Sequence, residues 1–265
     1  MVLNRQIAVL TVALTGLSGA GPVRAAFDVE LVTGSGATNI SQVGLVYSAT
    51  GTAATVGVDD LFATLNTLGS AELNTGDGGA EPGDISSANF SITGVYTFAT
   101  SGTLWLNAAA GIELGTGSIS FHATGLDAPG VRLTATNNNI NLHALTSTSD
   151  SGSGGAVFLD MEDAGATVNV IDTRSVGGTG GAFTMLSPDS FSFADIINLG
   201  QVRTGSDGLS SSQNSGNGGN ITIGEPNEST RFGFDLLDTS SEGDASAGDG
   251  GDVLVENGGT LGGTG

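Results

Sequence analysis

The second half of the chain repeats one pattern of hydrophobic and polar positions. Four times, two hydrophobic residues flank an Asn or Asp, and a Thr/Ser-rich stretch, a Gly-Gly pair and a second alternating triplet follow. The opening triplets are Ile140–Leu142, Val168–Val170, Ile197–Leu199 and Phe234–Leu236, which begin 28, 29 and 37 residues apart. Recurrence of the same residue types at such a period is the signature of a solenoid, in which successive coils stack on one another.

Each triplet predicts a short strand, because alternation with period two places its flanking residues on one face. The second triplets are Val157–Leu159, Phe183–Met185, Ile221–Ile223 and Val253–Val255. A similar texture at a shorter period predicts further strands at Val95–Phe98, Thr103–Leu106, Ile112–Leu114, Ile119–Phe121 and Val131–Leu133. The pattern therefore predicts an all-β protein, a right-handed parallel β-helix. An antiparallel sandwich would also space its strands regularly, but would not repeat the same residues at the same positions.

The middle residues of the opening triplets are expected to occupy equivalent positions in successive coils. These four residues are Asn141, Asn169, Asn198 and Asp235. Alternation turns them outward, whereas a bend would turn them inward, where stacked amides form a hydrogen-bonded ladder. The Gly-Gly pairs are expected at sharp corners that need a positive φ. The longest insertion, Ser206–Asn217, is expected to project as a loop, since the triplets on either side keep their pattern.

The amino terminus predicts a secretory signal peptide over residues 1–26. Arg5 precedes an apolar run, Ile7–Leu17, and small residues end the segment at Val23–Ala26. Eleven residues are too few to cross a bilayer; a buried strand or core helix is the alternative. The mature chain is therefore expected to be secreted or displayed at the outer-membrane surface.

Two regions follow the leader. Residues 27–92 are expected to form an amino-terminal cap with degenerate first coils, within which Asp59–Leu68 is either a short helix or another coil. Residues 93–265 form the repeat region. No capping element is recognisable after it, and natural solenoids avoid an open sheet edge. The pattern therefore favours a repeat region truncated at its carboxyl end.

Composition supports stacked coils over a compact globular core. The chain has 45 glycines, only 5% aromatic residues and no cysteine, so neither large aromatic side chains nor disulfides hold it together. The formal net charge is −21, and it becomes −23 once the leader's two arginines are removed. Such a charge repels nucleic acids and anionic lipids, which excludes both as partners.

Acidic turns offer a candidate calcium site and no other cofactor is expected. The candidate ligands are Asp160, Glu162, Asp163, Asp244, Asp249 and Asp252. Oxygen-rich flexible turns suit Ca²⁺; the alternative is that these acids only solvate an exported surface. His122 and His143 are not expected to bind zinc, which needs three or four ligands.

An enzyme is the alternative function. Polysaccharide lyases and hydrolases with the parallel β-helix fold use acids and a base on one face, where Asp160, Asp163, Arg132 and Arg174 are the residues available here. Few arginines and few candidate sugar-stacking aromatics (Trp105, Tyr47 and Tyr96) argue against it. We therefore expect no catalytic residues.

Three runs resemble the repeat region of filamentous-haemagglutinin-type exoproteins. They are TLWLNAAAGIELGTGSI (103–119), VRLTATNNNINL (131–142) and GNGGNITI (216–223), and the likeness extends over residues 94–257. It implies a secreted β-helix of the adhesin kind, exported through a two-partner outer-membrane pore. The Asn-Pro-Asn-Gly-Ile-type secretion motif of that system is missing between residues 27 and 92, so the export route stays open. The implied function is a structural or adhesive surface protein, which binds a glycan or protein of a host or neighbouring cell through an elongated face.

Overall fold

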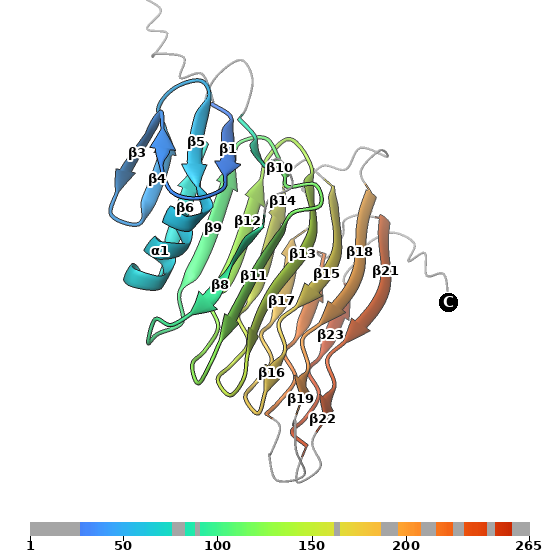
Figure 1. Cartoon of the computed structure of the whole chain (residues 1–265). Coiled ribbons are helices and arrows are strands. Elements are labelled where there is room, and N and C mark those ends of the chain that lie inside the picture. Colours follow the sequence, from blue (N-terminus) through green and yellow to red (C-terminus); the bar gives the residue numbers. More distant parts are fainter. Residues whose placement is uncertain are drawn as a thin grey trace, which may run out of the picture.

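The computed structural model describes residues 27–75, 83–87, 91–161, 165–186, 196–207, 216–224, 231–242 and 247–255. These residues form a β-solenoid of about 6 turns, as the sequence predicted. Two sheets build its walls, and the chain passes from one to the other in every coil (Figure 1).

Within the described residues, the larger sheet, sheet A, has 14 strands. They are β1 (Val29–Val32), β2 (Ala37–Thr38), β5 (Ala54–Gly57), β7 (Ile85–Ser87), β8 (Ile92–Tyr96), β10 (Ile112–Glu113), β11 (Ser118–Ala123), β13 (Ile140–Ser149), β15 (Ala166–Asp172), β16 (Ser175–Val176), β18 (Ile196–Arg203), β19 (Ser206–Asp207), β21 (Arg231–Asp238) and β22 (Ser241–Glu242).

Sheet B has 9 strands. They are β3 (Ile40–Val43), β4 (Val46–Ala49), β6 (Ala71–Asn74), β9 (Thr103–Ala108), β12 (Gly130–Ala135), β14 (Val157–Met161), β17 (Phe183–Leu186), β20 (Ile221–Ile223) and β23 (Val253–Val255). From β9 to β23 every pairing in this sheet is parallel, and each strand pairs with its counterpart one coil away.

An antiparallel cap closes one end of the stack, drawn in blue in Figure 1. Strand β2 pairs antiparallel with β5, and β3 with β4. The segment expected as helix or coil is a helix, α1 (Val58–Leu68). It buries Leu61 and Leu65, and Tyr47 reaches it through a hydroxyl–hydroxyl bond of 2.6 Å to Thr64.

Alternation of burial along the strands follows the predicted pattern. In β13, Ile140 and Leu142 are fully buried, whereas Asn141 between them faces outward. The inward residues of both sheets join one continuous hydrophobic core, made mostly of Val, Ile, Leu and Ala. Stacked coils therefore build an interior from small side chains, because each coil covers the next.

The predicted ladder of Asn141, Asn169, Asn198 and Asp235 is wrong in its register. Asn141 pairs with Thr167, and Thr167 pairs with Asn198, so Asn169 lies two residues beyond the shared position. In the next coil Asn198 pairs with Gly233 and not with Asp235. The cause is an outward bend inside the strand: residues 169 and 170 of β15 both face away from the core. The sequence of a triplet alone does not show where the triplet lies relative to this bend.

The residues that do form a ladder are the inward Thr and Ser of the stretch after each triplet. Buried Thr173 and Thr204 donate hydrogen bonds of 2.5 Å to the carbonyls of Gly181 and Gly219. Ser175 and Ser206 make equivalent bonds, of 2.5 and 2.6 Å, to Gly152 and Gly178. These hydroxyls donate to buried carbonyls along the narrow edge of the solenoid. Without them, the carbonyls would lack a hydrogen-bond donor.

The same ladder corrects two further expectations. Ser206 belongs to the wall as part of β19, so the insertion expected to project does not begin there; residues 208–215 of it lie outside the described residues. The Gly-Gly pairs also have no positive φ. A Cβ on Gly180 would instead overlap the carbonyl oxygen of Thr204, so glycine is needed for space where the chain passes the hydroxyl ladder.

Candidate functional site

A stacked row of large side chains crosses the outer face of sheet B. Trp105, Arg132 and Phe158 pair directly across β9, β12 and β14. The Arg132 guanidinium carbon lies 4.8 Å from the centroid of each ring, so this cation is held between two aromatic faces. Asp160 accepts a 2.8 Å hydrogen bond from Arg132, and the Trp105 indole donates one of 3.1 Å to Thr134. These contacts fix the row across three coils.

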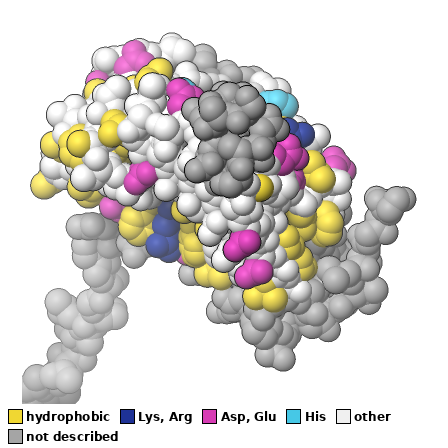
Figure 2. Space-filling model, turned by 90° about the horizontal axis from the view of Figure 1, so that it is seen from below, with side chains coloured by type: hydrophobic (Ala, Val, Ile, Leu, Met, Phe, Trp, Pro, Cys, Tyr) yellow, Lys and Arg dark blue, Asp and Glu magenta, His cyan; other side chains and the backbone are white. Residues whose placement is uncertain are grey.

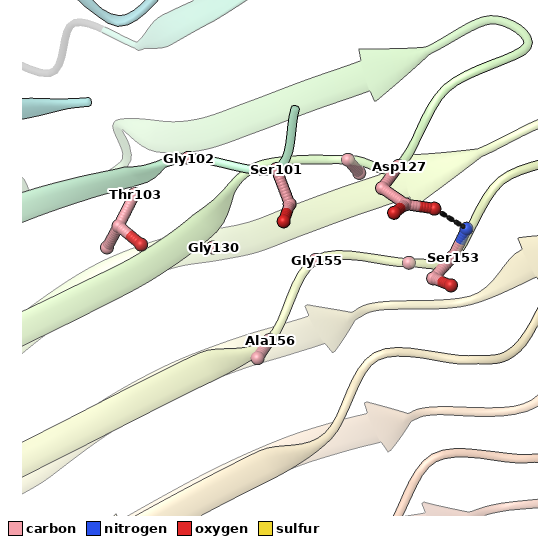
Figure 3. Close-up of a pocket in the computed structure, with 10 residues that line it drawn as sticks. Ser101, Gly102, Thr103, Asp127, Gly130, Ser153, Gly155 and Ala156 are labelled. Carbon is pink, nitrogen blue, oxygen red and sulfur yellow. Dashed lines mark hydrogen bonds between the residues drawn. The ribbon is translucent and has the colours of Figure 1, made fainter. Parts of the chain in front are cut away.

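A hollow of about 300 Å³ lies beside this row, where the corner loops meet the starts of β9 and β12. Figure 3 shows Ser101, Asp127 and Ser153 on successive corner loops above it. Thr103, Gly130 and Ala156 line it from the wall. Because Thr103 lies two residues before Trp105 and Gly130 two before Arg132, the hollow and the row share one face of the sheet.

Most polar side chains that line the hollow have no hydrogen-bond partner among the described residues. Asp127 accepts a 2.7 Å hydrogen bond from the amide of Ser153 through Oδ1. The hydroxyls of Ser101, Thr103 and Ser153 make no hydrogen bond within the described part of the chain. The hollow therefore presents three hydroxyls and a carboxylate edge to whatever enters it.

Sheet A carries a different, charged groove of about 280 Å³. In it, Arg174 bonds Asp172 at 2.8 Å and reaches Asp207, one coil on, at 2.9 Å. His122 lies 3.1 Å from Asp150. Hydrogen bonding to Asp172 is the main cause that raises the pKa of Arg174 above its ordinary value, against desolvation by burial. The Arg174 guanidinium is bound by two carboxylates, one of them in the next coil. The charge pairs of this groove therefore link neighbouring coils.

The charges and hydrophobic side chains are unevenly distributed over the surface. Figure 2 shows cationic side chains bordered by hydrophobic ones in one area, and His beside cationic and acidic side chains in another.

The calcium candidates are only partly described. Asp160 is already paired with Arg132, while Glu162, Asp163 and Asp244 lie outside the described residues. The backbone amides of Asp249 and Asp252 donate hydrogen bonds to the side-chain oxygens of Asn217 and Asn220, at 3.0 and 2.9 Å. Among the described residues, no group of three or more His, Asp or Glu side chains is placed to hold a metal. Calcium binding stays a prediction.

The groups considered for a catalytic cleft do not converge. Arg132 and Asp160 lie on sheet B, whereas Arg174 lies just before β16 on sheet A, and Asp163 is outside the described residues. Of the three candidate aromatics, Tyr47 and Tyr96 are buried and Trp105 alone faces outward.

Sequence reasoning singled out Trp105 and Arg132 but missed the hollow beside them. The available signal was the alternation itself, which puts Thr103, Trp105 and residue 107 on one face. The pairing register could not be read from the sequence. This register places Gly130 beside Ala156, and these two small residues leave room for the hollow.

Comparison of the chain with protein-family models, with curated proteins and with solved structures gives no match. Within the described residues, no helix has the length and apolar character needed to cross a membrane.

Proposed function

We propose that the chain is a secreted or cell-surface structural and adhesive β-solenoid of the filamentous-haemagglutinin-like kind. It binds a glycan or protein on another cell through an elongated face and carries out no catalysis. The observation that carries this proposal is the outer face of sheet B, where the stacked row and the hollow beside it span β9, β12 and β14 without a convergent acid and base.

The wall suits such a role because the core is built from the inward residues and the hydroxyl ladder lies inside, so the outward side chains stay at the surface of the stack. Rigid elements that present side chains at fixed spacing are good binding surfaces, since little entropy is lost on association.

Export is the second part of the proposal, and the leader over residues 1–26 supports it. Expression of the full chain in a Gram-negative host should yield an exported protein whose first residue is Phe27, as read by mass spectrometry. Deletion of Ile7–Leu17 should retain it in the cytoplasm. An exported chain that keeps residue 1, or export without the apolar run, contradicts this part.

Adhesion is tested with beads coated with residues 27–265. They should attach to whole cells, and excess soluble chain should compete. Beads coated with the Gly180→Ala variant are the control for folding, since that corner does not tolerate a Cβ. Attachment equal to that of the control on every cell type tested would contradict an adhesive role.

A further inference from the structure

The geometry points to a saccharide-binding site in the hollow on sheet B, selective for neutral sugar units. This site rests on the proposed function and gives the adhesive face a ligand class and a position. It comprises Ser101, Thr103, Asp127 and Ser153, and the Trp105–Arg132–Phe158 row lies next to it, two residues further along each strand.

The shape of the hollow comes from missing side chains. The residues two positions before Trp105, Arg132 and Phe158 are Thr103, Gly130 and Ala156. Two of these three neighbouring coils therefore contribute a methyl group or less to the hollow. A volume of about 300 Å³ is at the lower end for small-molecule sites. One or two sugar rings of a longer chain fit such an open depression, and the rest of the chain continues along the face.

The chemistry of the lining favours a ligand with many hydroxyls. The hydroxyls of Ser101, Thr103 and Ser153, which have no partner among the described residues, both donate and accept, and the Asp127 carboxylate accepts. No cationic side chain lines the hollow, and the nearest one along β12, Arg132, is already bound to Asp160. A polyol satisfies such a mixed set, whereas an apolar ligand would leave the hydroxyls unpaired.

The neighbouring row offers apolar contact to the part of the saccharide that continues along the face. Both ring faces that point toward Arg132 are covered by its guanidinium, so the rings offer their outer edges. Carbon–hydrogen groups of a sugar ring pack against such edges while its hydroxyls bind the corner loops. This division of apolar and polar contacts is what orients a ligand in a small site.

Charge selects against acidic sugars. The mature chain has a formal charge of −23, and Asp127 faces the hollow. A uronate or sulfate placed there would meet a carboxylate and no available cation. Neutral hexoses and N-acetylhexosamines avoid this repulsion.

Trp105 is the only tryptophan of the chain, so its fluorescence reports on this site alone. Titration of residues 27–265 with cellohexaose, maltohexaose and chitohexaose should give a saturable change of Trp105 emission with at least one of them. Hexagalacturonate should give none. A neutral glycan array should agree with the titration, and mass spectrometry of the sugars afterwards should show intact chains, because the site binds without cleavage.

Two matched variants test the position. Ala156→Gln fills the hollow from an exposed residue and should weaken binding by about tenfold or more. Ala182→Gln is the control, because Ala182 takes the same place one coil on, away from the hollow, and Asn220 already places an amide there in the coil after. Asp127→Asn, which keeps an acceptor for Ser153 but removes the charge, should admit hexagalacturonate and so reduce the preference for neutral sugars.

The outcomes separate this site from the function on which it rests. If the beads adhere but Trp105 emission is unchanged by every neutral sugar, and Ala156→Gln beads adhere as well as Ala182→Gln beads, the site is wrong and adhesion stands. If Trp105 responds but no cell is bound, the adhesive function is wrong and the sugar site stands. Equal loss in both glutamine variants would also overturn the site, since it would show a general effect on the wall.

Discussion

In the cap, Gly34 has a φ of 81° and nothing within 4 Å of the position that a Cβ would take; in the coils, a Cβ on Gly180 would overlap the carbonyl oxygen of Thr204. The two glycines serve different needs. The cap turns the chain through antiparallel connections, which use left-handed backbone conformations. The Gly-Gly pairs of the coils keep ordinary backbone angles and bring strands and corners closer than any side chain permits.

The two ends of the stack also differ in how completely their inward side chains are buried. At the cap, Val29 and Val56 of the first coils are fully buried. At the other end, Val253 is 46% exposed, although it pairs with fully buried Ile221 in the neighbouring coil. An inward position is therefore buried only when a coil lies on both sides of it, as expected for a structure whose stability comes from nearest-neighbour contacts.

The largest difference is expected between the two glycines. Gly180→Ala should destabilise the chain by about 4 kcal/mol or more, or prevent folding, because backbone must move at a stacked corner. Gly34→Ala should cost about 1–2 kcal/mol, the cost of a left-handed alanine in open space. Urea unfolding followed by circular dichroism measures both. Similar losses of unfolding free energy would show that the backbone at the Gly180 corner moves at little cost. The coils would then resemble the cap in this respect.

These glycines also show how much the sequence could predict. Repetition of hydrophobic triplets predicted the solenoid, because burial with period two depends on local sequence alone. The same repetition placed Asn169 in the wrong register, because the Val168–Val170 triplet spans the outward bend in β15, which only the burial and the strand pairing reveal. For the candidate site, Trp105 was recognised as an aromatic residue, but its partners Arg132 and Phe158 lie 27 and 53 residues further on, and only the pairing register brings the three together.

A second pair of variants compares an inner coil with the last described coil. Val157→Ala should cost about 2 kcal/mol, because it removes two buried methyl groups and leaves a cavity. Val253→Ala, in the same column of sheet B, should cost less than about 1 kcal/mol, since much of its side chain already meets water. Thermal unfolding of both variants tests this. Equal costs would mean that the last described coil is covered in solution.

Hydrogen bonds of the interior should matter less than steric fit. Thr204→Val keeps the volume of the side chain but leaves the Gly219 carbonyl without its donor, at an expected cost of about 1–2 kcal/mol. In the cap, Tyr47→Phe removes the bond to Thr64 and should cost about 1 kcal/mol. Chemical denaturation decides between them. A neutral Thr204→Val would show that the ladder is not needed to hold the corner.

The smallest effects concern two carboxyl groups on the outward face of sheet A, one near the cap and one in the last coil. Burial tends to raise the pKa of Asp238, but hydrogen bonds from Ser240 and the charges of Arg203 and Arg174 outweigh it, so the pKa is lowered. Burial raises the pKa of Glu113, with a bond to Asn141 opposing and the charge of Asp84 adding to the rise.

The opposite shifts give opposite pH dependence. A lowered carboxyl pKa contributes stability above the unfolded-state value of 3.8, and this is lost as pH falls through the folded-state pKa. A raised one contributes stability below the unfolded-state value of 4.5, and this is lost as pH rises through the folded-state pKa. Asp238→Asn should therefore lower the melting temperature at pH 7 and have no effect at pH 2, whereas Glu113→Gln should raise it at pH 7. Melting curves at both pH values suffice, and shifts of the same sign at pH 7 would show that the two ends of sheet A do not differ in this respect.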